Sequence, residues 1–245
     1  MDPVRPEFLP DPGLSRDGME TLQHEIADTA RFEDDPDPSW GTASDSRPLV
    51  AGIDQAFFED RAVSAIVVLQ GERVVERTHA ISPLSIPYIP GLLAFREGAP
   101  IVDALSRLSC DPDVLLFDGS GRIHFREAGL ATHIGVLFDR PAVGVTKSLL
   151  CGHPKASPER RPAGWRTPIV ADESVSAPAG TTIGYAYQSK QYAPSASTSI
   201  NPLYVSPGHR TSAERAVDLV AECCTEYKLP EPIRLADRYA NQVKL

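Results

Sequence analysis

Two short apolar runs that each lead into an aspartate constrain this chain more than any other feature. The run Leu49–Asp54 reads LVAGID, and the run Val114–Phe117 is followed directly by Asp118. A short continuous apolar run bounded by turn residues is typical of a strand that is buried on both faces. Such strands alternate with helices in α/β folds, where ligand sites lie beyond the carboxyl ends of the strands. We therefore expect an α/β fold with Asp54 and Asp118 at one edge of its sheet.

The order of the other predicted elements narrows the fold. Two further strands follow the first and form a three-strand antiparallel meander with it, after which helices and strands alternate. This is the order of a ribonuclease H-like α/β fold, a central mixed sheet with helices on both sides. In that fold the first and fourth strands are neighbours, so Asp54 and Asp118 would project together. The predicted strands are 49–54, 63–69, 73–81, 114–117 and 142–145, and the predicted helical segments are 90–108, which begins with a turn, 129–137 and 212–227.

Composition is that of an ordinary globular protein. The 245 residues are 42% hydrophobic and 23% charged, which suits one domain. No stretch approaches the roughly 20 uncharged apolar residues of a membrane span, and the first 30 residues do not resemble a signal peptide. We expect a cytoplasmic protein with no membrane partner. The cysteines show no C-x-x-C spacing and are interpreted as reduced packing residues; they are Cys110, Cys151, Cys223 and Cys224.

The net charge of -9 belongs to the N-terminal segment. Residues 1–46 contain 12 acidic and 3 basic side chains, which leaves 21 of each in the rest of the chain. A neutral body can still present a local basic groove to phosphates. Residues 1–18, with four prolines, are predicted to be an acidic flexible tail. Apolar residues at helical spacing predict an N-terminal helix over 19–32, followed by a linker over 35–45 and a core over 47–240.

A long motif follows the predicted meander. Residues 87–98 read PYIPGLLAFREG, which is too long and unusual to arise from generic strand or helix chemistry. This motif resembles the signature of the endonuclease V family, the deoxyinosine 3' endonucleases. The resemblance covers about residues 19–240 and makes residues 19–245 a single catalytic domain. It continues through DGSGRIH at 118–124, GLATHIG at 129–135, VGVTK at 143–147, SPGHR at 206–210 and LPEPIRLAD at 229–237.

The resemblance implies a metal-dependent nuclease in which Asp54, Glu97 and Asp118 are catalytic and hold the metal. Phosphodiester hydrolysis needs a strong nucleophile and neutralisation of charge at phosphorus, and hard divalent cations held by oxygen ligands supply both. The strand-end positions of the two aspartates agree independently with this role, although single aspartates at strand ends are commonly turn formers. Mg²⁺ is the expected cofactor, with Mn²⁺ able to substitute. The resemblance also implies catalytic roles for Lys147 and His209, whose ordinary alternatives are a salt-bridged lysine and a surface turn histidine.

Base recognition would use a second set of residues. A damaged base inside a duplex must be extruded, at a cost of roughly a few kcal/mol. The segment Pro87, Tyr88, Ile89 and Pro90 suits a DNA wedge because the prolines stiffen it and the tyrosine offers a ring for stacking; the alternative is a Pro-rich turn with a core tyrosine. By resemblance, the base pocket would be lined by Gly91, Leu93, Gly119, Gly121 and His124, where glycines let backbone amides approach the base.

Three functions from different classes fit the sequence. The first is a DNA repair endonuclease that recognises deoxyinosine, the hypoxanthine nucleotide, in DNA. As the family does, it would hydrolyse the second phosphodiester bond 3' to the lesion and leave 3'-hydroxyl and 5'-phosphate ends. The second is an endoribonuclease acting on inosine in RNA, and the third is a binding module without catalysis, which is disfavoured because all three carboxylates are present. The protein is expected to be a monomer.

Overall fold

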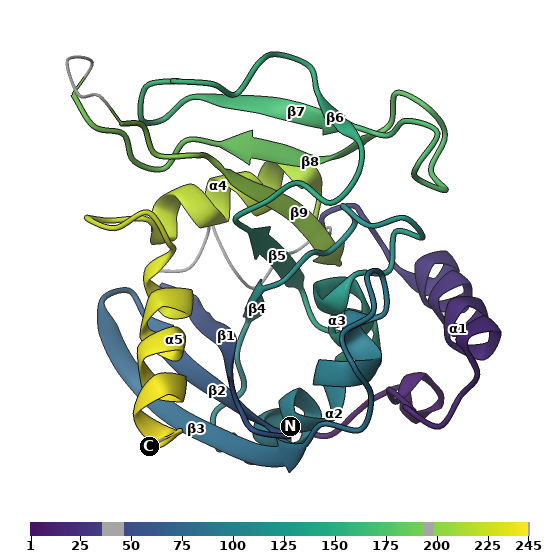
Figure 1. Cartoon of the computed structure of the whole chain (residues 1–245). Coiled ribbons are helices and arrows are strands. Elements are labelled where there is room, and N and C mark those ends of the chain that lie inside the picture. Colours follow the sequence, from purple (N-terminus) through teal and green to yellow (C-terminus); the bar gives the residue numbers. More distant parts are fainter. Residues whose placement is uncertain (36–46, 194–197, 245) are drawn as a thin grey trace.

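Nine strands form one mixed sheet in the part of the chain that the computed structural model describes, residues 1–35, 47–193 and 198–244. Their order across the sheet is β3-β2-β1-β4-β5-β9-β8-β7-β6 (Figure 1). The strands are β1 Leu49–Phe58, β2 Arg61–Gln70, β3 Arg73–Pro83, β4 Val114–Asp118, β5 Ala142–Thr146, β6 His153–Pro154, β7 Arg166–Val170, β8 Thr182–Tyr187 and β9 Leu203–His209.

The pairing of the central strands matches the predicted fold. β1, β2 and β3 pair antiparallel in sequence order, and β1 pairs parallel with β4 from Val50↔Val114 to Ile53↔Phe117. β4 then pairs parallel with β5, and β5 pairs antiparallel with β9. The antiparallel meander and the central contact between the first and fourth strands are therefore confirmed, and the architecture is ribonuclease H-like.

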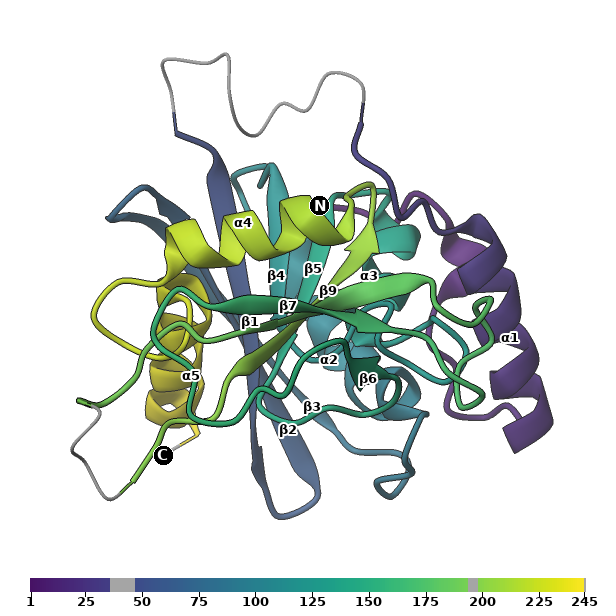
Figure 2. The ribbon, with the colours of Figure 1, turned by 90° about the horizontal axis from the view of Figure 1, so that it is seen from above.

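Helices cover both faces of the sheet, as Figures 1 and 2 show. One face packs against α2 and α3 around a core that includes Ile53, Phe117 and Ile134, and α1 lies against α3 on the outer side of this layer. The other face packs against α4 and α5 around a core that includes Val50, Leu116 and Ile233. The helices are α1 Arg16–Thr29, α2 Leu93–Ser106, α3 Leu130–Phe138, α4 Ala213–Cys223 and α5 Glu231–Val243. None of the helices within the described ranges is both long and apolar enough to cross a bilayer.

Two predicted boundaries differ from the structure. The first strand does not end at Asp54 but continues to Phe58, because its hairpin pairing with β2 runs on to Phe58↔Arg61. The parallel partner β4 stops earlier, so Asp54 stands one residue beyond the paired stretch Val50–Ile53. The helix predicted over 212–227 ends at Cys223, where the backbone of Cys224 becomes extended. The strands β6 to β9 and the helix α5 had not been predicted.

The N-terminal segment also differs from the predicted flexible tail. Phe8 is buried, and its carbonyl oxygen accepts a hydrogen bond from His133 Nε2 at 2.8 Å. The Met1 ammonium donates to the Leu105 carbonyl at 3.1 Å. Ser15 caps α1, which spans Arg16–Thr29 rather than 19–32. The proline and charge content of the segment does not reveal these few apolar and backbone contacts. They hold the segment against α2 and α3. The predicted linker over 35–45 lies, apart from residue 35, outside the described residues.

Candidate active site

Strand alternation brings three predicted site residues to the α5 face of the sheet. Val50 of β1 and Leu116 of β4 contribute to the core on this face, so Asp54 and Asp118, which follow them at even spacing, point the same way. Val145 of β5 is in the same core, and Lys147 follows it by two residues. Lys147 Nζ donates a hydrogen bond to Asp118 Oδ2 at 2.9 Å.

Helix α5 adds a fourth carboxylate that sequence reasoning had not assigned. Gly52 lets the helix approach, because a Cβ there would lie 2.1 Å from the backbone carbon of Pro232. Further along, Ala240 packs against Ala56. Asp237 lies between these two contacts, and its negative charge helps to raise the pKa of Asp54. The signal that could have found Asp237 was its place in the 229–237 motif, since it lies within a helix and not at a strand end.

The electrostatics of Asp54 show how closely the acidic groups are gathered. Burial raises the pKa of Asp54 to about 8, and the charges of Asp118 and Asp237 act in the same direction. A backbone hydrogen bond from Gln55 and the charge of Lys147 oppose this shift only partly. Without a further cation, the carboxyl is therefore favoured in its protonated form at neutral pH.

Glu97 approaches Asp118 from α2. Burial raises the pKa of Glu97 to about 7; the Arg96 guanidinium opposes the shift and the charge of Asp118 adds to it. The helix is joined to β1 by Gln55, whose Nε2 donates to the Glu97 carbonyl oxygen at 2.8 Å. The charge coupling with Asp118 joins Glu97 to the other carboxylates. We call Asp54, Glu97, Asp118 and Asp237 the acidic centre.

Lys147 is the cation beside the acidic centre. Burial lowers its pKa, but the hydrogen bond with Asp118 and the charges of the three aspartates outweigh burial and raise the pKa overall. The lysine is therefore charged at neutral pH. Its ammonium group can donate hydrogen bonds to anionic oxygens, including those of a phosphate.

The donor chemistry of the acidic centre fits a hard divalent cation. Within residues 1–35, 47–193 and 198–244, no three acidic, imidazole or thiol groups form a closed cage for an ion. Mg²⁺ does not require such a cage, because proteins usually hold it through one or two carboxylates together with waters and substrate phosphates. Asp54 and Glu97, the two buried carboxyls whose pKa is raised, would be stabilised in their charged form by such a cation.

The structure does not bring His209 to the acidic centre. His209 pairs with Ala142 at the start of β5, whereas Lys147 follows the far end of that strand. The four residues from Ala142 to Thr146, the end of β5, correspond to roughly 13 Å along the strand. The imidazole is buried, with Nε2 3.0 Å from Asp139 Oδ1 and Nδ1 accepting from the Arg31 backbone at 3.2 Å. The expected placement of His209 at the acidic centre is therefore corrected, because motif position alone does not give the direction of a strand.

The predicted wedge lies in a loop that is held at its base. Ile86 and Ile89 pack beside Leu92 and Phe95, while Tyr88 is 64% exposed. Pro87 and Pro90 are exposed as well. The Arg96 guanidinium donates to the Ile86 carbonyl at 2.8 Å. Tyr88 is therefore not a core residue, and its ring is free for stacking. We call residues 86–91 the wedge loop.

The predicted base-pocket residues fall into two groups that one helix connects. His124 Nε2 lies 3.0 Å from the Gly91 carbonyl oxygen, and the two residues belong to one buried cluster at the end of the wedge loop. Gly119 and Gly121 follow β4 and lie against β5 and β9. Gln23 of α1 connects the two groups, because its side-chain amide donates to the carbonyls of Gly91 and Ala128. The next residue, Gly129, donates to the Gly121 carbonyl. Leu93 begins α2 and is half-buried.

His124 has no free ring nitrogen for a base. Its Nδ1 accepts from the Arg126 backbone at 3.2 Å, and its Nε2 faces the Gly91 carbonyl. Burial lowers the pKa of His124 to about 4, so the ring is neutral and donates from Nε2. Through these contacts the imidazole supports the backbone of Gly91.

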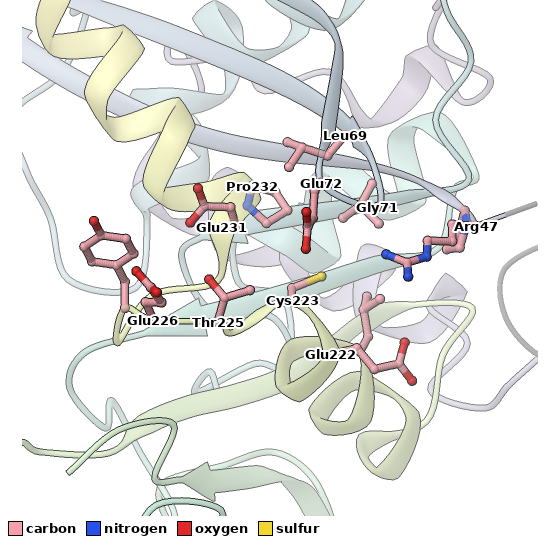
Figure 3. Close-up of a pocket in the computed structure, with 14 residues that line it drawn as sticks. Arg47, Leu69, Gly71, Glu72, Glu222, Cys223, Thr225, Glu226, Glu231 and Pro232 are labelled. Carbon is pink, nitrogen blue, oxygen red and sulfur yellow. The ribbon is translucent and has the colours of Figure 1, made fainter.

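A separate pocket lies at the amino end of β1, as Figure 3 shows. It is bounded by the turn between β2 and β3, the end of α4 and the start of α5, and its walls include Arg47, Glu72, Cys223 and Glu231. None of the predicted site residues lines it. The acidic centre lies beyond the other end of the paired stretch of β1, so this pocket is not part of it.

The fold and the acidic centre together define the class of protein: a ribonuclease H-like α/β protein with carboxylates gathered beside its first and fourth strands. Comparison with known proteins gives the family. The sequence profile named Endonuclease V matches residues 39–238. The chain belongs to the endonuclease V family, a family of nucleases.

Individual relatives agree over nearly their whole length. The Endonuclease V of Natronomonas pharaonis is 63% identical over 244 residues, covering 100% of this chain and 98% of the relative. The crystal structure of Endonuclease_V from Bacillus subtilis is 25% identical with a TM-score of 0.81, covering 100% of this chain and 97% of that one. Ciona intestinalis Endonuclease V, solved with a 24mer DNA containing an inosine followed by a ribo-adenosine, is 28% identical with a TM-score of 0.72, over 92% and 95% of the two chains.

Proposed function

We propose that the protein is a Mg²⁺-dependent DNA repair endonuclease that recognises deoxyinosine. It hydrolyses the second phosphodiester bond 3' to the lesion and leaves 3'-hydroxyl and 5'-phosphate ends. The observation that carries this proposal is the acidic centre, in which burial raises the pKa of Asp54 to about 8, the charges of Asp118 and Asp237 add to the shift, and Lys147 binds Asp118 at 2.9 Å. The inosine-containing DNA bound by the Ciona intestinalis relative supports the choice of target.

Asp54, Asp118, Glu97 and Asp237 would hold the metal. Mg²⁺ would lower the pKa of a bound water and neutralise negative charge on the phosphate. In the hydrolysis, the water oxygen forms a bond to phosphorus, the bond from phosphorus to the 3' oxygen breaks, and that oxygen takes a proton. Lys147, which is charged and bound to Asp118, can donate a hydrogen bond to a phosphate oxygen and orient the strand.

The wedge loop would act on the base. Tyr88 is exposed at the tip of a stiff, proline-flanked segment, so its ring can fill the gap left by an extruded base. Gly91, at the end of the loop, has a φ of +81°, a backbone conformation that glycine adopts readily. Extrusion is least costly for a mispaired base such as hypoxanthine, which favours this lesion over a paired adenine.

Inosine-containing RNA is the second candidate substrate. The strand bound by the Ciona intestinalis relative carries a ribo-adenosine directly after the inosine, so a ribose at that position is compatible with binding in that protein. The 2'-hydroxyl group is what allows a protein to distinguish RNA from DNA at a given position.

The test is cleavage of four matched strands, with inosine or adenosine at one position in DNA or in RNA. We expect Mg²⁺-dependent cleavage of inosine DNA that exceeds cleavage of adenosine DNA by at least about a hundredfold. Faster cleavage of inosine RNA would move the function to the second candidate. Equal cleavage of inosine and adenosine strands would contradict both.

A further inference from the structure

We propose that Gln23, in the N-terminal helix α1, is a positioning residue for base recognition: its side-chain amide fixes the backbone of Gly91 at the end of the wedge loop. This inference rests on the proposed function, because it assigns Gly91 to the base pocket. Helix α1 precedes residue 39, where the match to the family profile begins. The inference therefore extends the recognition site to an element outside the matched region.

Four hydrogen bonds form a closed ring around the Gly91 carbonyl. Gln23 Nε2 donates to the Gly91 oxygen at 2.8 Å, and Arg126 Nε donates to Gln23 Oε1 at 2.8 Å. The Arg126 backbone donates to His124 Nδ1 at 3.2 Å, and His124 Nε2 donates to the Gly91 oxygen at 3.0 Å. The ring joins three segments that are far apart in the sequence: α1, the wedge loop and the loop after β4.

The ring leaves the Gly91–Leu92 peptide with one orientation. The Gly91 oxygen has two lone pairs, and Gln23 and His124 use both of them. On the other side of the peptide, the Leu92 amide donates to the Ile89 carbonyl at 3.0 Å. The positive φ of Gly91 sets the direction in which the chain enters α2. Backbone amides that approach a base are positioned by these contacts.

The amide of Gln23 is not needed to dock α1. Met19 packs with Leu92 and Phe95, and Ile26 belongs to the main core, so apolar contacts already hold the helix. Gln23 is 1% exposed, and a buried amide lowers stability unless it is hydrogen-bonded. An aliphatic side chain would fill the same space. The amide therefore serves the orientation of Gly91 and Arg126 more than the packing of the helix.

Two substitutions test the amide. Gln23→Leu removes both hydrogen-bonding atoms, and Gln23→Glu keeps the acceptor for Arg126 but places an oxygen against the Gly91 carbonyl. Met19→Leu is the control, since it alters the packing of the same helix next to the wedge loop and removes no hydrogen bond. All three are made in an Asp118→Asn background, so that binding is measured with Mg²⁺ and without cleavage.

The measurement is the ratio of Kd values for labelled DNA strands with adenine or inosine at one position, by fluorescence anisotropy. We expect both Gln23 variants to lower the preference for inosine about tenfold, with adenine-strand Kd unchanged, and Met19→Leu to keep the preference. An unchanged preference in the Gln23 variants, or an equal loss in Met19→Leu, would overturn the inference. If Gln23→Leu does not fold, the Kd ratio of Gln23→Glu alone tests the inference. A parent protein with no preference for inosine would overturn the proposed function itself. Failure of the proposed function is thus distinguishable from failure of the role assigned to Gln23.

Discussion

At the scale of single residues, Asp118 is the carboxylate that interacts with Lys147, Asp54 and Glu97. It accepts the hydrogen bond from Lys147, and its charge adds to the burial that raises the pKa of both Asp54 and Glu97. We predict that Asp118→Ala lowers the cleavage rate of inosine DNA in Mg²⁺ by at least about a hundredfold, because metal coordination contributes several kcal/mol at the transition state. Gel-based single-turnover assays measure this.

The exposed carboxylate Asp103 of α2 provides the control for Asp118. Asp103→Ala should keep the parental cleavage rate, and both variants should melt within a few degrees of the parent because neither opens a hydrophobic cavity. An Asp118→Ala protein that cleaves at the parental rate would show that the acidic centre is not the catalytic site.

The pKa of Asp54 predicts how stability changes with pH in the absence of metal. The ordinary aspartate value is 3.8, and the folded value is about 8, so between these values the folded protein binds more protons at this site than the unfolded chain does. The contribution of Asp54 to the free energy of unfolding therefore falls as pH rises through this window. Glu97, raised to about 7, acts in the same direction.

Asp54→Asn removes the titrating group and nearly preserves its shape. Urea unfolding in EDTA between pH 6 and 8 should show stability falling with pH more steeply in the parent than in the variant. The difference between the two proteins cancels the titration of groups that both contain. The same slope in both proteins would mean that the Asp54 carboxyl is not desolvated as the structure indicates.

Tyr88 gives a prediction for the wedge loop. Tyr88→Ala should weaken binding of inosine duplex by about 5- to 150-fold, because base stacking on an aromatic ring is worth roughly 1 to 3 kcal/mol. The rate of bond cleavage in bound substrate should change less. Tyr88→Phe is the matched control and should bind as the parent does, since it keeps the ring. If Tyr88→Ala bound the duplex with parental affinity, the wedge assignment would be wrong.

At the scale of elements, the N-terminal segment is where the structure changes the expectation most. Phe8 is 7% exposed and belongs to the main core. We predict that Phe8→Ala lowers the free energy of unfolding by about 3 to 5 kcal/mol and the Tm by several degrees, the usual effect of truncating a buried aromatic side chain. Val4→Ala, at a side chain that is 63% exposed, is the control and should melt like the parent. Equal Tm values for Phe8→Ala and the parent would instead support the prediction that residues 1–18 are a flexible tail.

The elements that sequence predicted well are those with a strong period or a continuous apolar run. The meander, β4 and α3 have this property, and their positions were predicted within a few residues apart from the extended end of β1. The strands β6 to β9 were not predicted from the sequence. The strands β7 and β9 contain Pro168 and Pro207, and the loops between β6 and β9 are about a dozen residues long or longer. Helix α5 was hidden by its Pro232 near the N-terminus, which reads as a turn.

The site was predictable to the same degree as its elements. Asp54 and Asp118 follow from strands, and Glu97 and Lys147 came from motif resemblance. The charge coupling with Asp118 and the hydrogen bond from Lys147 join the four. Asp237 was missed because its contribution depends on how α5 crosses β1 at Gly52 and Ala56, which is a tertiary contact. His209 was expected beside the other site residues, but β9 runs antiparallel to β5 and places it at the other end of that strand.

At the scale of the whole molecule, the two faces of the sheet supply different parts of the site. Helix α5 and the central strands contribute the aspartates of the acidic centre, while α1 and α2 hold the wedge loop and the Gly91 backbone. A base extruded at the wedge loop would thus be recognised beside α1 and α2, while its backbone is cut at the acidic centre, to which α2 contributes Glu97. Helix α2 links recognition to chemistry, because Arg96 holds the wedge loop and the neighbouring Glu97 belongs to the acidic centre.

The most direct test of this account is the position of the cut in one end-labelled duplex that contains a single deoxyinosine, mapped on a sequencing gel with Mg²⁺ and with EDTA. The account predicts one product, cut at the second phosphodiester 3' to the inosine with a 3'-hydroxyl end, formed in Mg²⁺ alone. Cleavage that is unchanged in EDTA, or that occurs at positions unrelated to the inosine, would contradict it.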